Sequence, residues 1–207
     1  MGDCFFNRMI NKYKIYNKEG KIMSEQITVN LDILEMMLFY WESVASKDKM
    51  SDEYFNEIAN KSEMQVLYAE DFTPESVRRV LSCISNREKL NSTSKEEFRF
   101  WSQNMRMLED SKLLHSMLSP VKCLNLSSLK DKLKTTEPIE VIFLPFSYGD
   151  YLVRGNKIYF NFFSIIARYK MDYTSAETGD DATVEIEVLL GGKSVKDYVE
   201  DVIAQTY

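Results

Sequence analysis

The sequence predicts an α+β fold with a helical N-terminal layer, a small mostly antiparallel sheet and a C-terminal helix. Apolar residues recur at helical spacing from residue 30 to 135, whereas runs rich in β-branched and aromatic residues begin after residue 136. The 207 residues include only seven glycines and four prolines, fewer than the tight turns of a sandwich or barrel require. Long helices are therefore expected.

The composition excludes general disorder and disfavours nucleic-acid binding. Hydrophobic residues make up 44% of the chain and aromatic residues 13%, which is ample for a packed core. The net charge of −6 repels phosphate, so no nucleic acid is expected as a partner.

The N-terminal extension, residues 1–24, is the most basic part of the chain. It reads as a solvated extension or as an arm that binds nucleic acid or a membrane surface, and Met23-Ser24-Glu25 also resembles an ordinary protein start. Its basic residues are Arg8, Lys12, Lys14, Lys18 and Lys21.

A run of helices is expected in the helical region, residues 25–135. One helix begins after Asn30 and another at Ser51. Thr73-Pro74-Glu75 starts a third, because the missing N–H of a proline costs nothing in the first turn after a capping threonine. A capping box at 94–97 opens a fourth helix. Helical segments are also expected at 113–118, continuing until Pro120, and at 124–133.

The remaining region, 136–207, is expected to hold the small sheet and the terminal helix, in one domain with 25–135. Strands are predicted at 139–144, at 157–162 and at 183–188, the last with one face exposed to solvent. A further strand pairing is expected to begin at 151–153. From Ser194 the apolar residues follow a helical stripe that still continues where the chain stops at Tyr207.

The cysteines and the apolar runs predict a cytoplasmic protein without a membrane anchor. Cys4, Cys83 and Cys123 are odd in number, widely spaced and without a CxxC motif, which argues against a disulfide framework or a structural zinc site. The apolar run 31–40 is too short and too charged to span a bilayer. The N-terminus has no cleavable signal pattern.

Gly191-Gly192-Lys193-Ser194 lies between a predicted strand and a helix and invites comparison with a phosphate loop. Backbone N–H groups at a helix N-terminus attract phosphate, and lysine adds charge. The first position of an eight-residue loop, however, would be Glu187 rather than glycine. We therefore expect a β-to-α turn with Ser194 as a helix cap.

The other candidate groups also have structural explanations. His115 is the only histidine, lies among leucines and is expected to be a partly buried or capping residue rather than a catalytic one. The acidic group Glu177, Asp180 and Asp181 matches no EF-hand spacing and reads as a solvated loop. Glu185 and Glu187 share a strand face, as on any half-exposed strand. Five aromatic residues are candidates for a groove but are expected in the core and its rim: Tyr148, Tyr151, Tyr159, Trp41 and Trp101.

Three segments follow the helices: Glu140-Val141-Ile142-Phe143-Leu144-Pro145, a Tyr-Gly turn, and the run Gly155 to Asn161. Together with the helices, they resemble the N-terminal part of uncharacterised gluzincin-type zinc peptidases. In that family an extended strand pair precedes a helix bearing His-Glu-x-x-His, and residues 198–207 look like the stretch leading into it. The resemblance spans 25–207. The zinc histidines, the general-base glutamate and the downstream glutamate ligand have no counterpart here.

The resemblance implies a truncated or degenerate zinc-peptidase relative that retains the scaffold without the metal site and is not an enzyme as it stands. No catalytic, cofactor-binding or metal-ligating residue is assigned, and no cofactor is expected. An alternative is an acidic protein-binding module that engages a protein or peptide at a sheet edge. A third hypothesis is a metal-independent enzyme that uses His115.

Overall fold

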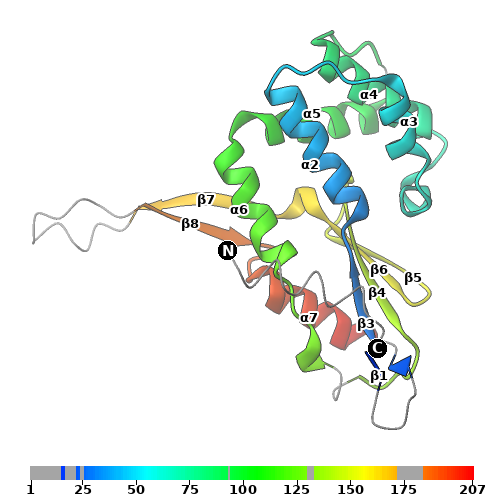
Figure 1. Ribbon diagram of the computed structural model, residues 1–207, viewed down its shortest axis with the longest axis vertical. Helices are drawn as coiled ribbons and strands as arrows, with labels where there is room; N and C mark the ends of the chain where they lie inside the picture. Colours follow the sequence, from blue (N-terminus) through cyan, green and yellow to red (C-terminus); the bar gives the residue numbers. More distant parts are fainter. Residues whose placement is uncertain (1–14, 17–21, 24–25, 93, 130–132, 172–183) are drawn as a thin grey trace, which may run out of the picture.

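The computed structural model describes residues 15–16, 22–23, 26–92, 94–129, 133–171 and 184–207 and confirms the α+β class. Figure 1 shows helices α3, α4 and α5 gathered at one end of the molecule, and α7 beside the main sheet towards the other. The α-helices are α2 (Asp32–Ala45), α3 (Asp52–Asn60), α4 (Pro74–Asn86), α5 (Lys95–Glu109), α6 (Ser111–Lys122) and α7 (Val195–Thr206).

The main sheet is mixed, which differs from the mostly antiparallel sheet that the sequence predicts. Its order is β3-β4-β6-β5, in which β3, β4 and β6 are parallel and only β5 is antiparallel. The difference arises at two pairings. The predicted strands β4 and β6 pair in parallel, and β3, which the sequence analysis missed, lies directly before α2 and pairs in parallel with β4 across the whole helical region. The strands are β3 (Ile27–Asn30), β4 (Ile139–Leu144), β5 (Tyr151–Arg154) and β6 (Lys157–Asn161).

A separate two-stranded hairpin extends from the body of the molecule (Figure 1). It consists of β7 (Ile166–Met171) and β8 (Val184–Leu189), in antiparallel register with Arg168 opposite Glu187. The prediction of a strand at 183–188 is thus confirmed, whereas its partner β7 was missed. A further short pair joins β1 (Ile15–Tyr16) and β2 (Ile22–Met23).

The helix-start signals are confirmed with one change. The Thr73 hydroxyl accepts a hydrogen bond from the Ser76 N–H, and the Ser76 hydroxyl accepts one from the Thr73 N–H, which completes a capping box. Ser94 caps α5 by accepting from the Glu97 N–H, but the Glu97 side chain turns away to pair with Arg79. The capping box expected at 94–97 is therefore only half formed.

Two helical predictions have the wrong extent. Helix α6 continues past Pro120 to Lys122 instead of ending at the proline. In the segment 124–133 the described residues contain only the 3₁₀ turn η2 (Ser127–Leu129). The other 3₁₀ turns are η1 (Ser62–Leu67) and η3 (Phe162–Ser164).

Trp41 connects the helices to the sheet. Its indole is 1% exposed and stacks on Phe162 at 5.7 Å, just beyond the end of β6. The indole N–H donates to the Asn104 side-chain oxygen at 2.9 Å, and the Asn104 amide donates to the Phe100 carbonyl. A buried tryptophan with a satisfied N–H thus fixes α2, α5 and η3 together.

Within the described residues, no helix has the length and apolar character needed to cross a membrane.

Candidate functional site

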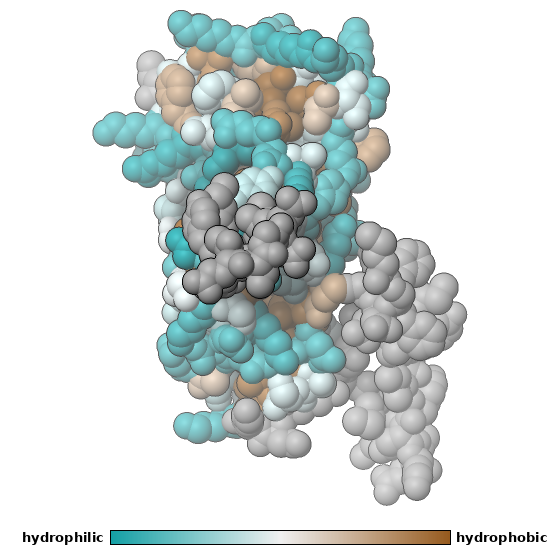
Figure 2. Space-filling view, turned by 90° about the vertical axis from the view of Figure 1, so that its left-hand side faces the viewer, coloured by the Kyte–Doolittle hydropathy of each residue, from teal (hydrophilic) through white to brown (hydrophobic). Residues whose placement is uncertain are grey.

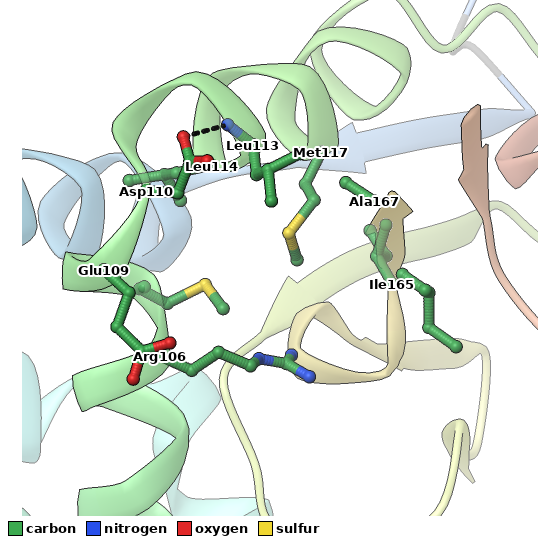
Figure 3. A pocket seen from close by; sticks show the side chains of 10 residues that line it. Arg106, Glu109, Asp110, Leu113, Leu114, Met117, Ile165 and Ala167 are labelled. Atoms are coloured by element: carbon green, nitrogen blue, oxygen red, sulfur yellow. Dashed lines mark hydrogen bonds between the residues drawn. The ribbon is translucent and has the colours of Figure 1, made fainter. Parts of the chain in front are cut away.

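Helices α5 and α6 meet at Asp110, and the start of β7 lies opposite this elbow (Figure 3). The space between them is a cleft of about 120 Å³, which we call the elbow cleft. No motif in the sequence signals it, because it combines one helix–helix junction with a strand more than fifty residues further on. Its lining residues are Arg106, Met107, Glu109, Asp110, Leu113, Leu114, Met117, Ile165, Ile166 and Ala167.

The interior of the elbow cleft is apolar and its rim is charged. Met107, Leu114, Met117 and Ile165 are all less than 5% exposed. Arg106 lies at the rim and donates to the Phe163 carbonyl at 2.6 Å. Burial lowers the pKa of Arg106, although the Glu109 carboxylate opposes this shift.

Asp110 fixes the geometry of the cleft. One carboxylate oxygen accepts from the Lys112 and Leu113 N–H groups and caps α6 (Figure 3). The other accepts from the Tyr169 hydroxyl of β7 at 2.9 Å. The Leu113 N–H and the Tyr169 hydroxyl, in that order, hold the pKa of Asp110 below its usual range. The Lys112 ammonium lies 5.7 Å from the centre of the Tyr169 ring, so β7 is tied to the first turn of α6 by two contacts.

An open strand edge lies beside the elbow cleft. Among the described residues, β7 pairs only with β8. In an antiparallel pair, every second residue directs its N–H and C=O away from the partner strand. Ile166, at the mouth of the cleft, is 57% exposed. This arrangement places backbone groups that face away from β8 beside an apolar recess.

A second recess is formed by the C-terminal ends of α2 and α4 with α5. It measures about 400 Å³ and is lined mainly by apolar side chains, among them Ile84, Trp101, Met105 and Leu108. On the face of the molecule drawn in Figure 2, hydrophobic residues framed by hydrophilic ones are visible in the upper part. The free thiol of Cys83 lies in the wall of the second recess, and burial raises the pKa of this thiol, so it is a weaker nucleophile than an ordinary cysteine.

The Gly-Gly-Lys-Ser segment forms the turn and cap that the sequence predicts. Leu190 and Lys193 exchange backbone hydrogen bonds at 2.9 and 3.0 Å across the two glycines. Lys193 pairs with Asp201 at 2.5 Å, and the Ser194 hydroxyl caps α7 at the Asp197 N–H. A side chain at Gly191 would meet the Tyr198 ring at 2.1 Å, which explains the glycine without a phosphate.

His115 is exposed rather than partly buried. One ring nitrogen lies 2.7 Å from the Ser111 carbonyl and the other 3.1 Å from a Glu42 carboxylate oxygen. Both neighbours are acceptors, so the histidine forms a surface bridge between α6 and α2. No contact places His115 beside Cys83.

The remaining candidate residues are not brought together into one site. Glu187 forms an ion pair with Arg168 at 2.6 Å, and Glu185 lies opposite Lys170 in the register. Glu177, Asp180 and Asp181 lie outside the described residues. Trp41 and Tyr159 are buried, Trp101 lines the second recess, and Tyr148 and Tyr151 are exposed on and before β5.

Two further observations concern metals and disulfides. The described part of the chain contains no group of three or more His, Cys, Asp or Glu side chains placed to hold a metal ion. Cys123 is disulfide-bonded, whereas the number and spacing of the cysteines argue against a disulfide framework.

Comparison with known proteins finds no matching family model, no similar curated protein and no similar solved structure.

Proposed function

We propose that this chain is a protein-binding module in which β7 accepts an extended segment of a partner as an added strand, and in which the elbow cleft receives one apolar side chain of that segment. The observation that carries the proposal is the position of the open β7 edge directly beside an apolar recess. In this mode of recognition, main-chain hydrogen bonds supply affinity, and a pocket beside the strand supplies specificity.

The fixed contacts around β7 support this proposal. Strand addition is favoured when the receiving strand is already held in place, since less ordering entropy is lost on binding. The Tyr169–Asp110 hydrogen bond and the Lys112–Tyr169 contact hold β7 against α6. The volume of about 120 Å³ suits a single side chain rather than a drug-sized ligand.

The wider scaffold is the basis for a second proposal. The resemblance to zinc peptidases is based on residues 140–145 and 155–161, which contain most of β4 and all of β6, and on residues 198–207, most of which lie in α7. The chain has one histidine, whereas the His-Glu-x-x-His motif needs two. We therefore propose a relative of these peptidases that, over these 207 residues, retains the scaffold and binds without hydrolysing. Tight stoichiometric zinc binding by the purified chain would contradict this second proposal.

Selection of peptides from a random display library tests the binding proposal. Enriched peptides, titrated into isotope-labelled protein, are expected to shift the backbone amides of 166–171 and to slow their hydrogen exchange. Ile166→Asp, which places a charge at the mouth of the cleft, is expected to weaken binding about tenfold or more. The matched control is Phe98→Asp, because Phe98 is also exposed, at 44%, but lies on α5 away from the cleft lining. Failure to enrich any peptide, or equal binding by the Ile166→Asp protein, would refute the proposal.

A further inference from the structure

The second recess is larger than the elbow cleft and has a mainly apolar wall. It measures about 400 Å³, compared with about 120 Å³ for the elbow cleft. Its wall includes Trp101, Met105 and Leu108 of α5, Val44 of α2 and Ile84 of α4. Ile84 is buried, whereas the other four side chains pack against the core and remain partly exposed. A molecule bound in this recess would therefore cover apolar surface that the chain itself leaves in water.

Helix α4 ends at the second recess in a closed cap. Arg87 has a left-handed backbone conformation, with a φ of 58°. The Glu88 N–H donates to the Cys83 carbonyl at 2.8 Å, and the Arg87 N–H donates to the Ile84 carbonyl at 3.1 Å. These are the two hydrogen bonds of a Schellman motif. Because Cys83 and Ile84 both line the recess, the carbonyls of two wall residues already accept hydrogen bonds within the chain.

Helix α2 ends at the same recess in the same way. Lys47 has a left-handed backbone conformation, with a φ of 66°. The Lys47 N–H donates to the Val44 carbonyl at 3.1 Å, and the Asp48 N–H donates to the Ser43 carbonyl at 2.9 Å. The carbonyl of Val44, a third wall residue, is thus also engaged. Both helix ends are held by the chain itself, and they add little unsatisfied polarity to the recess.

The charges at the second recess cancel. Among the described residues that line it, only Arg87 and Glu88 are charged, and both are exposed. They carry opposite charges and are neighbours in the chain, so the lining has no net charge that selects an anion or a cation. Burial raises the pKa of the Cys83 thiol, which therefore stays uncharged at neutral pH. A charged ligand would lose hydration here without meeting an excess of the opposite charge.

We propose that the second recess binds an uncharged aromatic small molecule. The partly exposed indole of Trp101 can stack on an aromatic ring, and the thioether of Met105 makes favourable contacts with such rings. The volume lies in the range of small-molecule sites and exceeds the space that one side chain needs. The inference is independent of the function proposed for β7, since the second recess and the elbow cleft share no lining residue.

The experiment compares two fluorescent probes, N-phenyl-naphthylamine and anilinonaphthalene sulfonate, which share an aromatic skeleton and differ by a sulfonate group. Each probe is titrated into the full chain. The neutral probe is expected to bind saturably, with one molecule per chain, and the sulfonate about tenfold more weakly, because its charge must be desolvated. Raising the salt from about 0.1 M to about 1 M should not weaken binding of the neutral probe, because salt screens only charged groups.

Variants locate the bound probe. Trp101→Ala is expected to weaken binding of the neutral probe about tenfold, and Met105→Gln, which adds polar atoms at similar volume, about fivefold. The matched control is Phe39→Ala, which removes an exposed aromatic ring of α2 outside the recess and should leave binding unchanged. Ile166→Asp, at the elbow cleft, should also leave it unchanged. Circular dichroism shows which variants are folded, and Met105→Gln serves as the test if Trp101→Ala does not fold.

Cys83 gives a second readout at the recess itself. A maleimide labels free thiols, and peptide mass analysis measures the labelling rate at Cys83 alone. The rate is expected to fall about fivefold when the neutral probe is saturating, because this thiol lies in the recess wall. The inference is overturned if the neutral probe does not bind saturably, if the sulfonate binds as tightly, if the folded recess variants bind like the wild-type protein, or if labelling of Cys83 is not slowed.

Discussion

The ion pair between Arg79 and Glu97 gives a prediction whose magnitude follows from the structure. Arg79 of α4 lies 2.9 Å from one carboxylate oxygen of Glu97 in α5. The Glu97 side chain is 3% exposed, and its second oxygen has no hydrogen-bond partner among the described residues. Arg79→Met would therefore leave a buried carboxylate without its counter-charge.

Removing one partner of a fully buried ion pair costs about 3–5 kcal/mol. The Arg79 side chain is 44% exposed, so water can partly replace the guanidinium and lower this cost. We expect Arg79→Met to reduce the free energy of unfolding by about 2 kcal/mol. The double variant Arg79→Met with Glu97→Met has no buried charge, and its stability should lie within about 1 kcal/mol of the wild-type value.

Urea denaturation followed by far-ultraviolet circular dichroism measures these differences, with both single variants and the double variant forming a cycle. For a chain of this size, the loss for Arg79→Met corresponds to a melting temperature about 4–8 °C lower. If the double variant is as unstable as Arg79→Met alone, the unpaired carboxylate is not the cause and the reasoning fails.

Three further predictions concern the turn before α7, the phenol of Tyr54 and the elbow between α5 and α6. Gly191→Ala should lower the free energy of unfolding by about 2–3 kcal/mol in urea denaturation, because residue 191 has a left-handed backbone conformation and the new methyl group would meet the Tyr198 ring at 2.1 Å. Gly155→Ala, at a residue with a similar φ but open space around it, should lower this free energy by only about 1 kcal/mol. Burial, with a smaller contribution from Glu57, raises the pKa of Tyr54 to about 12. The difference between the ultraviolet titrations of the wild-type protein and Tyr54→Phe should therefore show one phenol that ionises near pH 12, and a midpoint near the ordinary value of 10 would contradict this burial. The lowered pKa of Asp110 stabilises the folded state at pH values above the unfolded-state pKa, and this stabilisation is lost as the pH falls through the folded-state pKa. Asp110→Asn, which can still cap α6, should therefore make the free energy of unfolding depend less on pH in the acid range. An unchanged pH dependence would refute this prediction.

Local signals in the sequence predicted most helix starts and the strands with strong β-branched character. Thr73 and Ser94 are caps whose chemistry acts within three residues, and both were correctly placed. Strand β3 was missed because its four residues adjoin a strong helix and gain their partner from β4, across the helical region. A pairing of that range leaves no periodic trace in a single sequence. The parallel pairing of β4 with β6 was missed as well, although both strands were predicted.

The candidate sites were less predictable than the fold. Sequence motifs led to Gly191, His115 and Glu187, and each of these has a local structural role in the folded chain. Neither the elbow cleft nor the ring contact between Phe39 and Tyr54 has a motif, because each depends on how separate elements pack. Phe39 and Tyr54 are neighbours because α2 and α3 pack against each other.

Asp110 shows how the elbow cleft and the open strand edge depend on one another. A single carboxylate both caps α6 and holds Tyr169 of β7, so the orientation of the helix and the position of the hairpin base are set by the same group. Asparagine at this position can still cap α6 through its single side-chain oxygen, but its NH2 group cannot accept from Tyr169, and it lacks the charge that strengthens both bonds. A partner strand bound along β7 would in turn stabilise the contact between Tyr169 and the first turn of α6. Peptide binding at the β7 edge should therefore increase hydrogen-exchange protection in the first turn of α6, while an unchanged first turn would show that the hairpin and the elbow respond independently.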